Sequence, residues 1–166
     1  MTQIKLKGNP INTSGSLPKL GSQAPDFRLT KADLADVTLK EFVGKKVVLN
    51  IYPSIDTGIC AMSVRKFNQQ ASDMDNTVVI GVSKDLPFAL KRFCGAEGIE
   101  KVITTSSLRD DKFGAAYGVR IMEGGMEGLM SRAVVILDET GKVIYTEQVP
   151  EITQEPDYAA AILALK

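Results

Sequence analysis

The sequence predicts an α/β fold in which helices flank a central mixed sheet and an N-terminal β-hairpin precedes it. Two apolar runs, residues 47–52 and 77–82, are rich in β-branched side chains, as is typical of strands buried on both faces. A helical pattern over residues 58–72 separates them, and a crossover of that length indicates a parallel, right-handed unit. Two later strands, residues 133–137 and 142–145, are joined by a short turn and should form an antiparallel hairpin.

Shorter strands are expected before the first buried run. Residues 3–6 and 11–13 flank a turn at residues 8–10, which contains glycine and proline and predicts the small N-terminal hairpin. Residues 37–39 have the composition of another short strand.

The ends of the remaining helices are marked by capping and stop signals. Asp85 is a suitable N-cap for a short helix that ends near Cys94, with Gly95 as the stop. A weaker helix is expected over residues 110–117. The helix at residues 156–165 begins with a proline, which is favoured in the first helical turn.

Length and composition fit one globular domain. The chain has 166 residues without an internal repeat, a low-complexity tract or a linker. Parallel strands followed by an antiparallel hairpin suit a thioredoxin-like sheet, so we expect a single domain of this type over residues 1–166. Twenty basic residues balance twenty acidic ones, and like charges form no block, which argues against nucleic-acid binding.

The sequence favours a cytoplasmic protein. The first ten residues lack the apolar core of a signal peptide, and no apolar run approaches the roughly 18 residues that a membrane span needs. The chain has two cysteines, Cys60 and Cys94. In a reducing compartment we expect such a pair to be catalytic or sensing rather than a permanent disulfide.

The most informative segment runs from Pro53 to Cys60, between the first buried strand and the helix that follows. Cys60 should lie in the first helical turn, where free backbone N–H groups and the helix dipole favour an anionic, nucleophilic thiolate. The alternative is a buried, inert thiol. Thr57 is either an N-cap or a hydrogen-bonding partner of the sulfur or of a bound oxygen. Pro53 ends the strand and could also shield the sulfur from water.

The absence of histidine from the chain restricts the chemistry. It excludes Cys–His and Ser–His–Asp catalysis and histidine-ligated metal sites. A cysteine without imidazole needs a leaving group that departs easily, a requirement that peroxides meet and amides do not. An arginine is expected to pair with the thiolate and polarise the peroxide. Spacing does not choose among the candidates, which are Arg65, Arg92, Arg109, Arg120 and Arg132.

The pattern Pro-x-x-x-Thr-x-x-Cys at positions 53, 57 and 60 resembles the active-site motif of peroxiredoxins. Residues 50–57, 63–68 and 92–98 look like those of the bacterial thiol peroxidase group, the atypical two-cysteine peroxiredoxins. The resemblance runs nearly from end to end of the chain.

This resemblance implies a peroxidase that acts on hydrogen peroxide and organic hydroperoxides. Cys60 would be the peroxidatic cysteine, oxidised to a sulfenic acid, and Cys94 the resolving cysteine of an intramolecular disulfide. Thr57 and Arg132 would be the activating pair, and Pro53 would complete the catalytic motif. The resemblance further implies thioredoxin as the reductant, a homodimer as the working form, and no cofactor or metal.

A physical constraint bears on that disulfide. Bridged cysteines need Cα atoms roughly 4.4–6.8 Å apart, a separation that thiols on two helices flanking a sheet usually exceed. We therefore expect the turn after Thr57 and the helix that carries Cys94 to unwind locally. Glycines beside both sites make such opening inexpensive.

Residues 122–130 contain three of the six methionines and three glycines. A flexible surface loop is the favoured interpretation of this segment. The alternative is an adaptable apolar wall of the site, which would favour organic hydroperoxides, or part of a dimer contact.

Two other functions stay open. A thiol–disulfide reductase is disfavoured because Thr57 stands where a Cys-x-x-Cys motif would have its first cysteine. A redox sensor that passes its oxidation to a partner protein would need the same reactive Cys60 but would not turn over.

Overall fold

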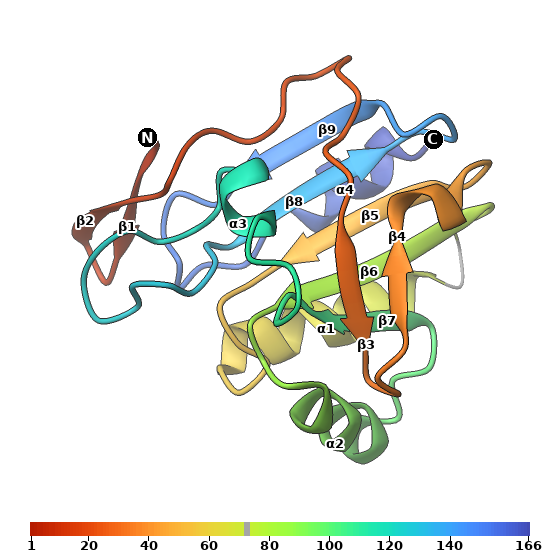
Figure 1. Cartoon of the computed structure of the whole chain (residues 1–166), viewed down its shortest axis with the longest axis horizontal. Helices are drawn as coiled ribbons and strands as arrows, with labels where there is room; N and C mark the ends of the chain where they lie inside the picture. Colours follow the sequence, from red (N-terminus) through yellow and green to blue (C-terminus); the bar gives the residue numbers. More distant parts are fainter. Residues whose placement is uncertain (72–73) are drawn as a thin grey trace.

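The computed structural model describes residues 1–71 and 74–166 (Figure 1). Its small N-terminal sheet consists of β1 (Gln3–Leu6) and β2 (Asn9–Asn12). The strands of the large sheet are β3 (Arg28–Lys31), β4 (Asp36–Thr38), β5 (Lys46–Ile51), β6 (Thr77–Ser83), β7 (Val102–Ser106), β8 (Ala133–Leu137) and β9 (Val143–Gln148). The helices are η1 (Leu39–Phe42), α1 (Gly58–Ala71), α2 (Pro87–Glu97), α3 (Phe113–Ala116) and α4 (Tyr158–Ala164).

The large sheet is mixed, with the strand order β4-β3-β7-β6-β5-β8-β9. Strand β5 pairs in parallel with β6 and antiparallel with β8, and β8 forms a hairpin with β9. The two buried runs and the later hairpin that the sequence predicts are therefore confirmed. Together with the helices and the separate β1–β2 pair, this is the predicted thioredoxin-like fold.

Two cores lie on opposite faces of the sheet. Helices α1, α2 and α4 contact one face, and α3 lies over the other (Figure 1). Alternate residues of β5 supply both cores, as expected for a strand buried on each side. Val48 belongs to the core that contains Phe67 of α1, whereas Leu49 belongs to the core that contains Phe113 of α3.

The N-terminal hairpin is confirmed, but its turn is displaced from the predicted position. Lys7 and Gly8 both have positive φ, at 50° and 84°, as a two-residue turn with the twist of a hairpin requires. Pro10 lies within β2, opposite Lys5, rather than in the turn. The two-stranded sheet tolerates this proline because both of its strands are edge strands.

Helix α2 begins and ends later than predicted. Its N-cap is Leu86, which has extended backbone and no side-chain cap, so the assignment of Asp85 as the N-cap is wrong. The carboxylate of Asp85 is engaged elsewhere, as described below. Gly95 lies inside the helix, and the left-handed stop is Gly98, with φ of 63°.

Other boundaries also shift by a few residues. Helix α4 follows Asp157, whose carboxylate accepts a hydrogen bond from Ala160 N at 3.0 Å, so Pro156 precedes the cap rather than opening the first turn. The helix predicted over residues 110–117 shortens to α3. Residue 72, the predicted end of the first long helix, lies outside the described residues. Strands β3 and β7 were not predicted.

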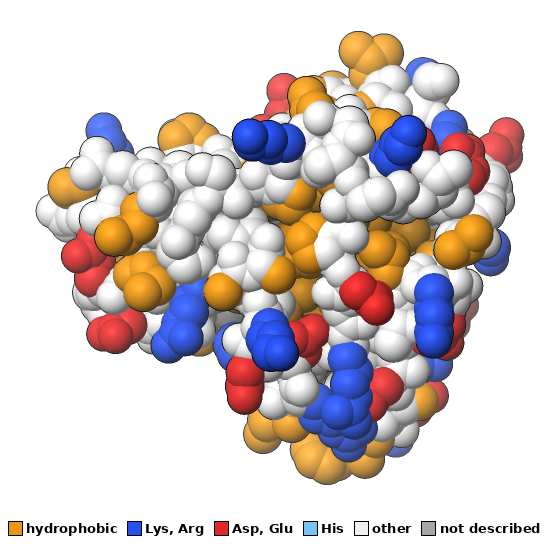
Figure 2. Space-filling view, turned by 45° about the horizontal axis from the view of Figure 1, so that its top comes forward, with side chains coloured by type: hydrophobic (Ala, Val, Ile, Leu, Met, Phe, Trp, Pro, Cys, Tyr) orange, Lys and Arg blue, Asp and Glu red, His pale blue; other side chains and the backbone are white. Residues whose placement is uncertain are grey.

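Basic and acidic side chains are interspersed over the face drawn in Figure 2, while hydrophobic side chains gather near its centre and at its lower edge. Over residues 1–71 and 74–166, no helix is long and apolar enough to cross a membrane. The same residues contain no group of three or more cysteine, aspartate or glutamate side chains placed to hold a metal ion.

Candidate active site

Cys60 is the third residue of α1, and its side chain is 0% exposed. Thr57 immediately precedes the helix. Its Oγ1 accepts a hydrogen bond from Cys60 N at 3.4 Å and donates one to the carbonyl of Ser54 at 3.1 Å. Thr57 thus caps the turn that carries the sulfur, and both predicted roles of this residue are compatible with its position.

Arg132 immediately precedes β8, the strand beside β5, and its side chain reaches the sulfur. Its Nη2 donates to Cys60 Sγ at 3.3 Å and its Nε donates to the carbonyl of Ile152 at 2.8 Å. The whole residue is only 2% exposed, and Nη1 has no hydrogen-bond partner among the described residues. Leaving such a buried donor unpaired is costly, so this nitrogen marks a place for an oxygen acceptor.

The sheet register selects Arg132 from the five candidate arginines. Ala133 pairs with Ile51 across β5 and β8, which places Arg132 beside the end of β5, where the segment leading to Cys60 begins. The other candidates lie at the surface, and three of them form exposed ion pairs. These are Arg65, Arg92, Arg109 and Arg120.

A cavity of about 210 Å³ lies beside Thr57 and Arg132. The guanidinium of Arg132 belongs to its lining and also contacts the Cys60 sulfur, so it connects the two. The walls come from segments that are far apart in the sequence, including the β1–β2 turn. The lining residues are Leu6, Lys7, Pro53, Thr57, Gly58, Ile59, Met126, Arg132, Ile152 and Thr153.

The methionine-rich segment at residues 122–130 contributes to this wall. Met122 is 44% exposed, in keeping with the favoured interpretation as a surface loop. Met126, in contrast, lines the cavity and packs against a small core that contains Ile4 and Ile152. The alternative interpretation, an apolar wall of the site, therefore holds for Met126.

Cys94 lies within α2 and is partly buried on the same side of the sheet as Cys60. Its Sγ is 3.3 Å from Thr104 Oγ1, and both cysteines are free thiols. Within the described part of the chain, Cys94 is not among the residues that line the cavity beside Arg132. The structure thus places the two cysteines on separate helices in a reduced fold.

Tyr52, the first residue after β5, belongs to the same core as Cys60 and is fully buried. Burial raises the pKa of Tyr52, and the negative charge of Asp85 raises it further, so the hydroxyl stays neutral. Its Oη has no hydrogen-bond partner among the described residues. Gly81 on β6 leaves room for this ring, because a Cβ there would lie 2.9 Å from the hydroxyl oxygen.

Asp85 is a residue of this region whose role the sequence did not reveal. Its Oδ1 accepts a hydrogen bond from Ser54 Oγ at 2.7 Å. Its Oδ2 accepts from Ile55 N at 2.7 Å and from Ser83 Oγ at 2.6 Å. Capping rules consider only neighbours along the chain, whereas two of these donors precede Asp85 by about 30 residues.

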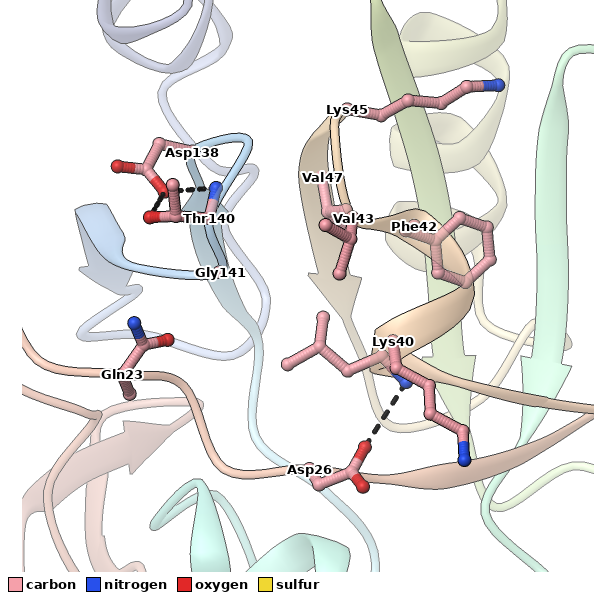
Figure 3. Close-up of a pocket in the computed structure, with 11 residues that line it drawn as sticks. Gln23, Asp26, Lys40, Phe42, Val43, Lys45, Val47, Asp138, Thr140 and Gly141 are labelled. Carbon is pink, nitrogen blue, oxygen red and sulfur yellow. Dashed lines mark hydrogen bonds between the residues drawn. The ribbon is translucent and has the colours of Figure 1, made fainter.

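Another cavity of about 210 Å³ lies near the beginning of β5, at the opposite end of this strand from Cys60 (Figure 3). Its apolar side includes Phe42, Val43 and Val47, and it faces the turn between β8 and β9. Neither cysteine is among the described residues that line it. The cavity beside Arg132, whose lining residue contacts the Cys60 sulfur, is therefore the better candidate for thiol chemistry.

Comparison with known proteins identifies the family. A family model described as Redoxin matches residues 19–162. Thiol peroxidases of Mycobacterium tuberculosis and Mycobacterium bovis are 56% identical over 165 residues, 99% of this chain and 99% of each relative. A solved peroxiredoxin-like protein from Aquifex aeolicus is 38% identical with a TM-score of 0.94, over 99% of this chain and 96% of that chain.

The fold also matches a more distant structure. A thiol peroxidase from Chromobacterium violaceum has a TM-score of 0.91 at 22% identity, over 98% of this chain and 94% of that chain. The Mycobacterium relatives match almost from end to end, and the motif at positions 53, 57 and 60 lies within the matched region. This chain therefore belongs to the redoxin family and, within it, to the thiol peroxidases.

Proposed function

We propose that this protein reduces hydrogen peroxide and organic hydroperoxides with Cys60 as the nucleophile and Cys94 as the resolving thiol. The observation that carries the proposal is the 3.3 Å contact from Arg132 Nη2 to Cys60 Sγ, made by a buried guanidinium with a second nitrogen unpaired among the described residues. Such a group stabilises the thiolate and still has a donor for a peroxide oxygen.

In the first step, the Cys60 thiolate attacks the terminal oxygen of the hydroperoxide. An S–O bond forms and the O–O bond breaks, so the sulfur loses two electrons and an alkoxide or hydroxide leaves and takes up a proton. The unpaired Nη1 of Arg132 is the donor that would stabilise that leaving oxygen, whereas the single hydroxyl proton of Thr57 is already donated to the Ser54 carbonyl. Removal of one such donor typically costs about 10²- to 10³-fold in rate.

In the second step, the Cys94 thiolate attacks the sulfenic sulfur of Cys60. An S–S bond forms, and hydroxide leaves and is protonated to water. Because the cysteines lie on α1 and α2, the turn after Thr57 and part of α2 must unwind for their Cα atoms to approach. A dithiol protein then reduces the disulfide by exchange.

The wider setting of the proposal follows from the resemblance and from composition. Thioredoxin is the proposed reductant, a homodimer the proposed working form and the cytoplasm the proposed location. One thioredoxin-like domain over residues 1–166 would carry the whole cycle, with Pro53 shielding the sulfur from water. No cofactor is required, since the two thiols supply both electrons.

The cavity supports a preference for organic hydroperoxides. Apolar side chains such as Leu6, Met126 and Ile152 line it, and an alkyl or aryl substituent would remove their surface from water. We expect kcat/KM for cumene hydroperoxide to exceed that for hydrogen peroxide. Equal values for the two substrates would contradict this part of the proposal.

A coupled assay with thioredoxin, thioredoxin reductase and NADPH tests the function. Wild type should consume many equivalents of either peroxide, and Cys60→Ser should consume none. Cys94→Ser should consume one equivalent and then stop with thioredoxin as the reductant. Retained activity of Cys60→Ser, or undiminished cycling of Cys94→Ser, would overturn the assigned roles.

The same assay separates the competing functions. A redox sensor would consume about one equivalent of peroxide per chain in the wild type. A thiol–disulfide reductase would reduce a model disulfide such as insulin without any peroxide. Thr57 lines the cavity and caps α1 in place of a second cysteine, which supports the peroxidase over the reductase.

A further inference from the structure

Asp85 joins three segments that surround the active site. It follows β6, precedes α2 by two residues, and accepts hydrogen bonds from the segment between β5 and α1. Its carboxylate is partly buried, and both of its oxygens are used. The residue thus ties the beginning of the Cys94 helix to the segment that positions Cys60.

The hydrogen bonds to Asp85 continue directly to the catalytic turn. Ser54 donates to Asp85 through its hydroxyl, and the same hydroxyl accepts from Asp56 N at 3.1 Å. The carbonyl of Ser54 accepts from both the amide and the hydroxyl of Thr57, at 3.2 and 3.1 Å. Thr57 Oγ1 in turn accepts from Cys60 N. An unbroken chain of contacts therefore connects Asp85 with Cys60.

The described ion pairs between α2 and the segments that carry Asp56 and Cys60 are exposed. Arg92 of α2 pairs with Asp56 at 3.2 Å, with side chains 70% and 65% exposed. Arg65 of α1 pairs with Glu97 of α2 at 2.8 Å and is 42% exposed. Exposed ion pairs contribute little to stability, whereas partly buried hydrogen bonds to a carboxylate contribute more. Asp85 is the stronger restraint.

We propose that Asp85 is a positioning residue that holds the turn of Cys60 and the beginning of α2 in the folded, peroxide-reactive arrangement. The inference rests on the proposed function, because the two steps of that cycle place opposite demands on this restraint. Attack on peroxide needs Thr57 and Arg132 held around the sulfur. Disulfide formation needs the same turn and α2 to separate and unwind.

Asp85→Ala removes all three accepted hydrogen bonds and should change the two steps in opposite directions. We expect sulfenic acid formation to slow about tenfold, since misplaced catalytic groups lose rate steeply. Conversion of the sulfenic acid to the disulfide should accelerate at least about threefold, because the unwound state becomes more populated. Rapid quenching and mass spectrometry, with a sulfenic acid trap, measure both rates.

Hydrogen exchange gives a readout that does not depend on peroxide chemistry. In reduced Asp85→Ala, the amides of residues 54–60 and 88–94 should exchange about tenfold faster than in wild type. If these amides exchange faster while wild type forms no sulfenic acid, the proposed function fails and the restraint stands. Unchanged exchange at both segments would overturn the restraint itself.

Asp138→Ala is the matched control. Asp138 also accepts three hydrogen bonds, from Thr140 N, Thr140 Oγ1 and Lys142 N, but in the turn between β8 and β9. It should lower thermal stability without changing either chemical step. Equal slowing of both steps in Asp85→Ala would overturn the proposal. So would a slower first step together with a faster second step in Asp138→Ala.

Conservative variants keep the test valid should Asp85→Ala fail to fold. The single amide oxygen of Asp85→Asn can still accept from Ile55 N, so its effects should be intermediate. Ser54→Ala removes the hydroxyl contact and leaves the carboxylate. Both variants should show the same opposite changes at smaller amplitude, and wild-type values in both would contradict the proposal.

Discussion

The guanidinium of Arg132 contacts the Cys60 sulfur with one nitrogen and the Ile152 carbonyl with another. The third, Nη1, is buried without a hydrogen-bond partner in the described part of the chain. Because the guanidinium is rigid and planar, fixing two of its nitrogens also fixes the direction of the third donor. The catalytic contribution of this residue should therefore depend on its shape as well as on its charge.

Arg132→Lys tests that dependence. The lysine keeps the positive charge but loses the planar set of N–H donors. We therefore expect kcat/KM for hydrogen peroxide to fall about 10²- to 10³-fold. Competition kinetics against a second peroxide-reactive protein measures the effect. Arg120→Lys makes the same change at an exposed site and should stay within about twofold of wild type. A similar small change in Arg132→Lys would contradict the proposed donor role.

Met126 offers a second test at this scale. Met126→Ala removes part of the apolar wall, so kcat/KM for cumene hydroperoxide should fall about tenfold, while that for hydrogen peroxide changes little. Met122→Ala is the control, since that side chain is 44% exposed and is not among the lining residues. Parallel losses for both substrates would show that Met126 supports the fold rather than the substrate.

Among the secondary-structure elements, α2 contains an interior glycine that favours local unwinding. Gly95 lies in its interior, where a glycine lowers helix stability relative to alanine. A Cβ added at this position would meet no atom within 4 Å. The helix that carries Cys94 is thus weaker than its packing requires, in keeping with the unwinding that the proposed cycle demands of it.

Gly95→Ala should strengthen α2 without altering the peroxide site. We expect the unfolding free energy of the reduced protein to rise by about 0.5–1 kcal/mol. Disulfide formation should slow about two- to fivefold, which is the rate equivalent of that energy. Urea denaturation and rapid quenching measure the two quantities. A faster disulfide step, or a slower reaction with peroxide, would contradict the role given to helix opening.

Across the whole molecule, stability should depend on a carboxylate that makes no described hydrogen bond to either cysteine. Asp36 joins the edge strand β4 to its neighbour β3 by accepting from Thr30 Oγ1 and Arg28 Nε at 2.8 and 2.7 Å. Burial alone would raise the pKa of Asp36, but these hydrogen bonds outweigh it, and the net effect lowers the pKa below its usual 3.8. Its stabilising contribution is therefore present above about pH 4 and is lost as the pH falls through the lowered value.

Asp36→Asn should accordingly destabilise the protein in a pH-dependent way. At pH 7 we expect a loss of about 1–2 kcal/mol, the size typical of hydrogen bonds to a charged group with partial exposure. The difference from wild type should shrink as the pH falls below 4 and the Asp36 carboxylate takes up a proton. Guanidinium denaturation at pH 7, 5 and 3 measures it, and a constant difference would contradict the assignment.

The parts of the site that lie close together in the sequence could be predicted from it. Pro53, Thr57 and Cys60 follow one strand end and open one helix, so local spacing sufficed. Arg132 could not be selected from the residues alone, because its position depends on the register between β5 and β8. Asp85 was assigned a local capping role because its partners across the fold are not visible in the sequence.

The same distinction between local patterns and contacts across the fold explains which strands could be predicted. Long apolar runs such as those of β5 and β6 were identified because their periodicity is strong. Strand β7 is five residues long and contains two threonines and a serine, and β3 is four residues long. Such short, polar segments become strands through pairing with neighbours, which sequence patterns do not report.

The complete burial of the Cys60 sulfur has a consequence for covalent labelling. An electrophile that modifies Cys60 in the native protein should enter through the cavity that Pro53, Thr57 and Arg132 line. Slender reagents such as iodoacetamide should alkylate this position, whereas bulky maleimide dyes should be directed to Cys94, which is only partly buried. An inhibitor designed against the enzyme would therefore need a slender electrophilic group attached to a compact apolar body.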